Sequence, residues 1–276
     1  MEGSSSNRSI FRAVSILRSF TPSDLELSGA EISRRVGLHR ATTHRMLTAL
    51  TECGMLRRIG KTGKYAIGPL LYQMGTLYLD TVDVFKASKP IMETIRDLTR
   101  EDIVMGMLDR GNIVLIMKEE SNLDFRIGRH VGESIPAYAS SMGKALLSEL
   151  TDAELDLLYP EEKLEPVTKK TVTRKAELRS ILRDVGKFGV AYDQESGRIG
   201  VEGVASVVRD AGGKAIAALC ISMPIFRANP ERRQKLAKLV TMSAALASSQ
   251  LGYRDSNKPV PDMREIQSWW VKQQSI

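Results

Sequence analysis

The chain has 276 residues, 42% of them hydrophobic, which is enough for two domains with a core each. Two cysteines are too few for a disulfide framework or a four-thiolate zinc site. The longest apolar stretch, residues 215–226, is too short to cross a bilayer. We therefore expect a cytoplasmic chain without a membrane span or a signal peptide. The net charge is +7, and residues 1–68 hold 11 Lys and Arg against 5 Asp and Glu, so the basic excess at this end predicts a polyanionic partner.

Three short helices are predicted at the start of the chain. Residues 10–20 carry an apolar stripe at i, i+3 and i+4 spacing. Ser28 and Glu31 form a capping-box pattern that begins a second helix, which ends at Gly37. A third helix is expected over residues 40–52. Two short helices joined by a tight turn that contains glycine are typical of a helix-turn-helix.

A β-hairpin is predicted directly after the third helix. Residues 55–59 and 65–67 read as strands, and the turn between them contains Gly60 and Gly63. Such a hairpin forms the wing of a winged helix-turn-helix, and Lys61 and Lys64 lie in its turn region. The wing is expected to lie along the DNA backbone while the third helix enters the major groove.

The face of the third helix opposite its apolar stripe is predicted to contact double-stranded DNA. Arginine can donate two hydrogen bonds to guanine, and threonine can contact phosphates or a thymine methyl group. Each of these side chains, taken singly, could also be an ordinary surface residue. The predicted DNA-binding residues are Arg40, Thr42, Thr43, His44 and Arg45 on the helix, with Lys61 and Lys64 on the wing.

A linker helix is expected over residues 69–83, because the segment after Pro69 is apolar on almost every side. A helix of this kind must be covered, and we expect the same helix of a second subunit to cover it. Two identical DNA-binding heads would then bind an inverted repeat.

The remainder of the chain is predicted to be an α+β sensor domain, residues 84–252, with an antiparallel sheet covered by helices. Strands are expected near residues 103–108, 113–118, 125–130, 190–193, 203–209 and 215–223. Residues 253–276 form a C-terminal tail that contains Trp269 and Trp270; it either docks on a neighbouring surface or is disordered.

Catalytic patterns are weak in this sequence. Ser141 and Lys144 have the S-x-x-K spacing of acyl-serine enzymes, but the single K-T-G lies earlier, in the wing, whereas those enzymes carry it later. Of the three histidines, His39 and His44 lie in the DNA-binding unit. We therefore expect no enzyme activity, no metal and no cofactor. The alternatives that stay open are an enzyme with a DNA-binding appendage and an architectural DNA-binding protein without a ligand.

The sequence resembles the IclR-type transcriptional regulators over about residues 8–252. The resemblance is carried by residues 37–47 (GLHRATTHRML), 53–56 (CGML) and 65–69 (YAIGP). The family usually has Ser where Ala41 stands. The resemblance implies a GAF-like effector-binding domain, a linker helix that forms homodimers, and pairs of these dimers.

The resemblance also implies an effector pocket. By position it would be lined by Ser141, Met142, Asp193, Val201, Gly203, Cys220 and Ser222. Family members that bind very small keto acids tend to have Gly-Ala in place of Ser141-Met142, and Ser in place of Cys220. The bulk of Met142 and the weak polarity of Cys220 therefore favour a larger, less polar carboxylate, such as an aromatic one, as the effector.

Overall fold

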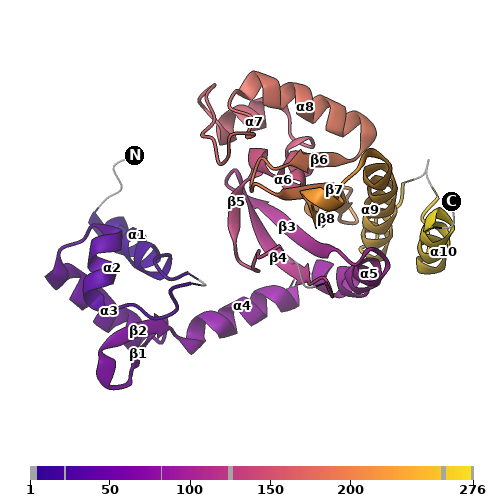
Figure 1. Cartoon of the computed structure of the whole chain (residues 1–276). Helices are drawn as coiled ribbons and strands as arrows, with labels where there is room; N and C mark the ends of the chain where they lie inside the picture. The colour runs from indigo at the N-terminus through magenta and orange to yellow at the C-terminus, as the bar shows by residue number, and fades with distance from the viewer. Residues whose placement is uncertain (1–4, 22, 82, 124–126, 256–258, 275–276) are drawn as a thin grey trace. The chain divides into compact units, whose positions relative to one another are not determined.

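The computed structural model describes residues 5–21, 23–81, 83–123, 127–255 and 259–274, without the side chains of residues 5–7, 61 and 78–81. The chain divides into two compact units, Met1–Val82 and Asp83–Ile276 (Figure 1). None of the helices in the described residues combines the length and the apolar character that a bilayer crossing needs.

The first unit is a three-helix domain with a β-hairpin and a following helix. Its capping box is present, since Ser28 N donates to Glu31 Oε2 at 2.7 Å and Glu31 N donates to Ser28 Oγ at 3.3 Å. Gly37 ends the second helix with a φ of 66°, a value that glycine adopts without strain. The elements are α1 (Ser5–Leu17), α2 (Gly29–Val36), α3 (Arg40–Glu52), β1 (Leu56–Ile59), η1 (Gly60–Thr62), β2 (Lys64–Ile67) and α4 (Pro69–Thr81).

The core of this unit joins its helices to the hairpin. Leu47 and Leu50 of α3 pack in one cluster with Ile32 of α2, Leu56 of β1 and Tyr65 of β2. The predicted second and third helices and the hairpin are confirmed. The first helix is observed at Ser5–Leu17, earlier than the predicted residues 10–20.

The second unit contains a six-stranded antiparallel sheet in the order β5-β4-β3-β8-β7-β6. Helices α5 and α9 contact the sheet through β3, β4, β7 and β8, and α6 contacts its other face together with α8 (Figure 1). The strands are β3 (Asp102–Asp109), β4 (Asn112–Glu119), β5 (Ser134–Pro136), β6 (Ala191–Gln194), β7 (Val201–Arg209) and β8 (Ala215–Pro224). The helices are α5 (Val84–Thr99), α6 (Ser141–Leu147), α7 (Asp152–Leu158), α8 (Lys175–Phe188), α9 (Pro230–Gln250) and α10 (Met263–Gln274), with short 3-10 turns η2 (Ala137–Ala139) and η3 (Ile225–Arg227).

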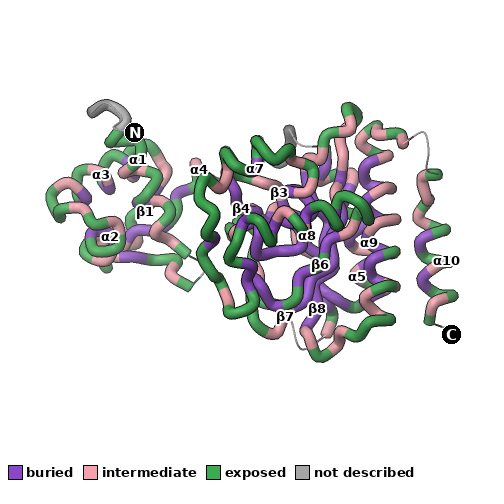
Figure 2. The backbone as a smooth tube through the Cα atoms, turned by 90° about the horizontal axis from the view of Figure 1, so that it is seen from above, coloured by how far each residue is buried: buried purple, intermediate pink, exposed green. Residues whose placement is uncertain are grey.

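Alternation along β8 assigns its side chains to the two faces. Ala218 and Cys220 belong to the cluster under α6 and α8, whereas Leu219 and Ile221 lie on the other face and are fully buried. Burial on both sides makes the central strands the most continuously buried part of the unit (Figure 2). The α+β class and the assignment of these faces are confirmed.

The strand predicted near residues 125–130 is not observed. Residues 124–126 lie outside the described part of the chain, and residues 127–130 are not in a strand. Ile127 N donates to the carboxylate of Asp102 and not to a strand carbonyl. Glu133 and the short β5 instead pair with β4, so this edge position is taken by later residues.

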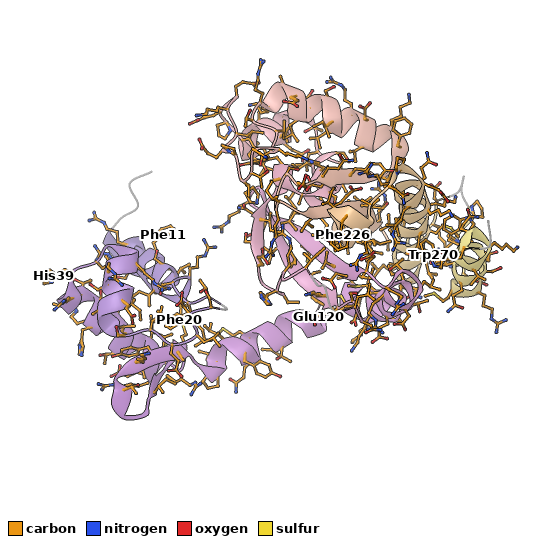
Figure 3. The ribbon with its side chains drawn as sticks, in the orientation of Figure 1. Phe11, Phe20, His39, Glu120, Phe226 and Trp270 are labelled. Atoms are coloured by element: carbon orange, nitrogen blue, oxygen red, sulfur yellow. The ribbon has the colours of Figure 1, made fainter. Side chains whose placement is uncertain are left out.

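The C-terminal tail contains a docked helix. Ile266 and Trp270 of α10 are buried, and Trp270 Nε1 donates to the carbonyl of Leu98 at 2.9 Å (Figure 3). The helix packs against α5 and α9 of its own chain. Disorder is thus wrong for residues 263–274, and the surface on which they dock belongs to the same chain.

Candidate functional site

The exposed face of α3 carries basic side chains in the first two turns of the helix. Arg40, His44 and Arg45 are exposed, and Thr42 is half-buried. Arg40 and His44 line one hollow of about 410 Å³ beside α2, together with Ala30. His39 precedes the helix and accepts a hydrogen bond from Ala41 N through Nδ1 at 3.4 Å. Neighbouring cationic and hydrogen-bonding groups of this kind suit contact with a nucleic acid backbone and base edges.

Thr43 was predicted on this face, and that prediction is wrong. Its side chain is 1% exposed, and Oγ1 donates to the carbonyl of His39 at 3.2 Å. Residues 43, 47 and 50 share one side of an α-helix, so Thr43 lies on the core side with Leu47 and Leu50.

The hairpin adds basic groups that the sequence analysis did not select. Arg57 and Arg58 on β1 are both exposed, and Lys64 on β2 is half-buried. The side chain of Lys61 lies outside the described residues. The tip turns at Gly63, whose φ is 67°. Alternation from the buried Leu56 could have identified Arg57 as exposed, but it would place Arg58 on the buried face, so it does not predict the exposure of Arg58.

In the second unit, one row of directly paired residues crosses the sheet on the side of α6. Asp193 of β6 pairs with Gly203 of β7, Gly203 pairs with Ser222 of β8, and Ser222 pairs with Asp102 of β3. Directly paired residues project to the same face. Three predicted effector residues therefore lie side by side, and Val201 precedes Gly203 by two residues on the same face.

The N-terminal end of α6 lies over Gly203. A Cβ atom at position 203 would come within 2.6 Å of Ser141 Oγ and 3.3 Å of Cys220 Sγ, so only glycine allows this approach. The Ser141 hydroxyl and the Cys220 thiol are 3.4 Å apart. The structure thus brings Ser141, Gly203, Cys220 and Ser222 together.

The side chain of Met142 points elsewhere. A Cβ atom at Gly106 would lie 3.2 Å from Met142 Sδ, and Gly106 pairs with Ala218, four residues along β8 from Ser222. Met142 belongs to the apolar cluster under α6 and α8. Its side chain is therefore core, and only its backbone is near Ser141.

The carboxylate of Asp193 is held by a lysine that the sequence analysis considered only as part of the S-x-x-K pattern. Lys144 Nζ donates to Asp193 Oδ1 at 2.7 Å and to Ser196 Oγ at 3.1 Å, and Ser196 Oγ also donates to Asp193. The side chains of Lys144 and Asp193 are 8% and 11% exposed. Since the hydrogen bonds of Lys144 go to Asp193 and Ser196, this lysine does not activate the Ser141 hydroxyl.

The thiol of Cys220 is neutral at physiological pH. Burial raises its pKa to about 11, and the hydrogen bond with Ser141 opposes this only in part. The described residues contain no group of His, Cys, Asp and Glu side chains placed to hold a metal ion. The site can therefore offer hydroxyls, a thiol and an ion pair to a small molecule.

The segment after β6 crosses the start of α6. Thr171 Oγ1 donates to the carbonyl of Ser196 at 2.7 Å, and Thr168 Oγ1 donates to that of Glu195 at 2.8 Å. A Cβ atom at Gly197 would lie 2.3 Å from the carbonyl oxygen of Ala139, so backbone packs on backbone here. Residues 194–200 thus border the site on the side of β6.

Two family models match this chain. The model described as the IclR helix-turn-helix domain matches residues 9–60, and the model described as the bacterial transcriptional regulator IclR C-terminal domain matches residues 76–249.

Individual proteins are similar over most of the chain. The HTH-type transcriptional regulator KdgR of Escherichia coli (strain K12) is 30% identical over 230 residues, which are 83% of this chain and 88% of that protein. The transcriptional repressor IclR of the same strain is 26% identical over 239 residues, 86% of this chain and 87% of its own. A crystal structure of an IclR homolog complexed with 4-hydroxybenzoate, from Microbacterium hydrocarbonoxydans, superimposes with a TM-score of 0.75 at 23% identity, covering 88% of this chain and 98% of that one.

Proposed function

Because the chain belongs to the IclR family of transcriptional regulators, with a helix-turn-helix DNA-binding domain, we propose that a small carboxylate effector controls its affinity for an operator. Like the relatives that it resembles, which are transcriptional regulators, it is a regulator and not an enzyme. We infer a cytoplasmic location, since the DNA of a bacterium lies there.

The observation that carries the effector proposal is the row Asp193, Gly203 and Ser222 beneath the start of α6. Small residues and hydroxyls converge there from β7, β8 and α6, which suits a ligand of few polar atoms. The homolog of known structure that carries 4-hydroxybenzoate supports an aromatic carboxylate as the class. The proposed effector-binding residues are Ser141, Asp193, Val201, Gly203, Cys220 and Ser222, with Met142 contributing its backbone.

For DNA, we propose that α3 lies in the major groove and the hairpin along the backbone. Exposure supports Arg40, His44 and Arg45 as the main contacts, with Thr42 beside them. Lys61 and Lys64 are proposed for the wing, where the exposed Arg57 and Arg58 add charge.

We also propose a homodimer through α4, which can associate further into pairs of dimers. Tyr72, Met74 and Leu77 of α4 are 77%, 50% and 66% exposed, an unusual amount of apolar surface for one helix. A second α4 would cover it and set two heads on an inverted repeat.

The test separates a ligand-controlled regulator from an architectural DNA-binding protein. Operator fragments selected by the full chain are labelled, and their binding is followed by fluorescence anisotropy with and without 4-hydroxybenzoate and a panel of related acids. Effector control predicts a change in operator affinity of about 5-fold or more with at least one acid. An operator affinity that none of these acids alters would favour the architectural alternative.

A further inference from the structure

Arg129 lies beside the candidate effector site, in the segment between β4 and β5. Lys118 Nζ donates to the carbonyls of Ile127 and Arg129, at 3.3 and 3.0 Å. Ile127 N donates to Asp102 Oδ2 at 3.1 Å, and Asp102 pairs directly with Ser222. The backbone that carries Arg129 is therefore anchored at the end of the row that contains Ser222.

The guanidinium of Arg129 is directed toward the start of α6. A Cβ atom at Gly197 would lie 3.3 Å from Arg129 Nη2 and 2.3 Å from the carbonyl oxygen of Ala139, which precedes Ser141 by two residues. The guanidinium thus lies next to Gly197 and to the backbone that precedes α6. Its side chain is only 11% exposed.

One end of this guanidinium is used and the rest is open. Nη1 donates to Glu133 Oε1 at 2.7 Å, and among the described residues this is the single acceptor that Arg129 bonds. Nε and Nη2 form no hydrogen bond with the described residues and are not fully enclosed, since neither is among the described buried polar atoms that lack a partner. An arginine with two adjacent free donors matches the geometry of a carboxylate.

The charge of Arg129 is less fully compensated than the charges of the other buried cations near the site. Three cations, Lys118, Arg129 and Lys144, have side chains that are 7–11% exposed. Two carboxylates of comparable burial, Asp102 and Asp193, face them, whereas Glu133, the partner of Arg129, is 33% exposed. The charge of Arg129 also reaches the thiol of Cys220: burial raises the pKa of that thiol, and Arg129 is among the groups that lower it. Of these three cations, Arg129 alone lacks an ion pair with a carboxylate of comparable burial among the described residues.

We propose that Arg129 determines the specificity of the site for carboxylates, by binding the carboxylate group of the effector through Nε and Nη2. The inference rests on the proposed function, because it assigns a residue to the effector of that same site. Asp193 repels the carboxylate of the ligand less than an unpaired carboxylate would, because Lys144 already compensates its charge. Lys144 in turn is less available to the ligand than Arg129.

The experiment compares acids with their uncharged amides in calorimetric titrations of the full chain. The probes are 4-hydroxybenzoate, phenylacetate and pyruvate, each beside its primary amide. Arg129→Met is expected to weaken binding of the acid by about 10- to 100-fold, the range for a lost hydrogen bond to a charged group, and to leave the amide unchanged. Arg183→Met is the matched control, because Arg183 is an exposed arginine of α8 outside the residues that border the site; it is expected to keep both affinities within about threefold.

The outcomes separate this inference from the proposed function. Unchanged acid affinity in Arg129→Met would overturn the role of Arg129 while leaving the effector proposal in place, and an equal loss for acid and amide would also overturn it. A wild-type chain that binds none of the acids would overturn both. If Arg129→Met does not fold, Glu133→Gln tests the role of Arg129 by removing the charge of its ion-pair partner. Removing the negative charge beside Arg129 should raise acid affinity by about 3- to 10-fold, and an unchanged affinity would overturn the proposal.

Discussion

The ammonium group of Lys144 lies 2.7 Å from the carboxylate of Asp193, and both side chains are almost completely buried. The pair joins α6 to β6, the two elements that border Gly203. A buried ion pair that loses one partner leaves an uncompensated charge in the protein interior, which is costly.

Removing one member of this pair should therefore destabilise the second unit. Lys144→Met is expected to lower the free energy of unfolding by about 3–5 kcal/mol. Asp152→Asn removes a carboxylate that is 82% exposed from its pair with Arg179, and it should cost less than about 1 kcal/mol. Urea denaturation followed by circular dichroism measures both. Equal, small effects of the two substitutions would mean that loss of the buried pair costs no more stability than loss of the exposed one.

Cys220 should make the free energy of unfolding fall as the pH rises above about 8.5. Burial raises the pKa of its thiol to about 11, against about 8.5 in an unfolded chain. Below pH 8.5 the thiol is protonated in both states, and between pH 8.5 and about 11 the unfolded state alone ionises, so stability falls as the pH rises. The stability difference between the wild type and Cys220→Ala should shift by about 2 kcal/mol from pH 7 to pH 10. Cys53→Ala, at an exposed thiol, is the control and should show no such shift.

Substitution of Ser222 tests whether the row Asp193, Gly203 and Ser222 binds the effector. Its hydroxyl lies on the face with Gly203 and Asp102, so Ser222→Ala should weaken effector binding by about 0.5–1.5 kcal/mol for a neutral partner, or about 1.5–3 kcal/mol for a carboxylate. Operator affinity without the effector should be unchanged, because the residue belongs to the second unit. Calorimetry with the acid panel and a gel shift on the operator are the measurements. Identical effector affinity in the variant would reject the assignment, and general unfolding would favour a structural serine.

The exposed face of α4 predicts a dimer that one charge can break. Leu77→Glu places a carboxylate on this face, where Leu77 is 66% exposed, and should shift the chain toward monomers at micromolar concentration. Leu157→Glu introduces the same charge at a leucine that is 82% exposed on α7 and should leave the assembly intact. Light scattering coupled to size-exclusion chromatography gives the masses. A wild-type chain that is itself monomeric would remove the dimer proposal.

Local signals explain what the sequence could predict. The capping box of Ser28 and Glu31, the glycines of the hairpin and the alternation along β8 each act within a few residues, and all are observed. The sequence could also have predicted that Thr43 is buried, because it lies seven residues before Leu50 and therefore on the same side of α3.

Long-range pairings explain what the sequence could not predict. Lys144 and Asp193 are 49 residues apart, and Trp270 meets the carbonyl of Leu98 across 172 residues. Arg129 lies in the segment predicted as a strand, residues 125–130, where Ile127 N instead donates to the carboxylate of Asp102. No periodicity in one sequence announces such contacts, because they depend on how the sheet and its helices are assembled.

The operator affinity of two arginine variants tests whether α3 binds the operator. Arg40→Ala and Arg45→Ala should each weaken binding by about 1–3 kcal/mol in anisotropy titrations at fixed salt, with Arg40→Ala relaxing sequence preference if it contacts a base. Arg183→Ala, at an exposed arginine of α8, should bind as the wild type does. Footprints of the wild type should show two protected half-sites related by an inverted repeat and separated by about one helical turn or a multiple of it. Operator affinity that is unchanged in both Arg40→Ala and Arg45→Ala would mean that α3 does not bind the operator.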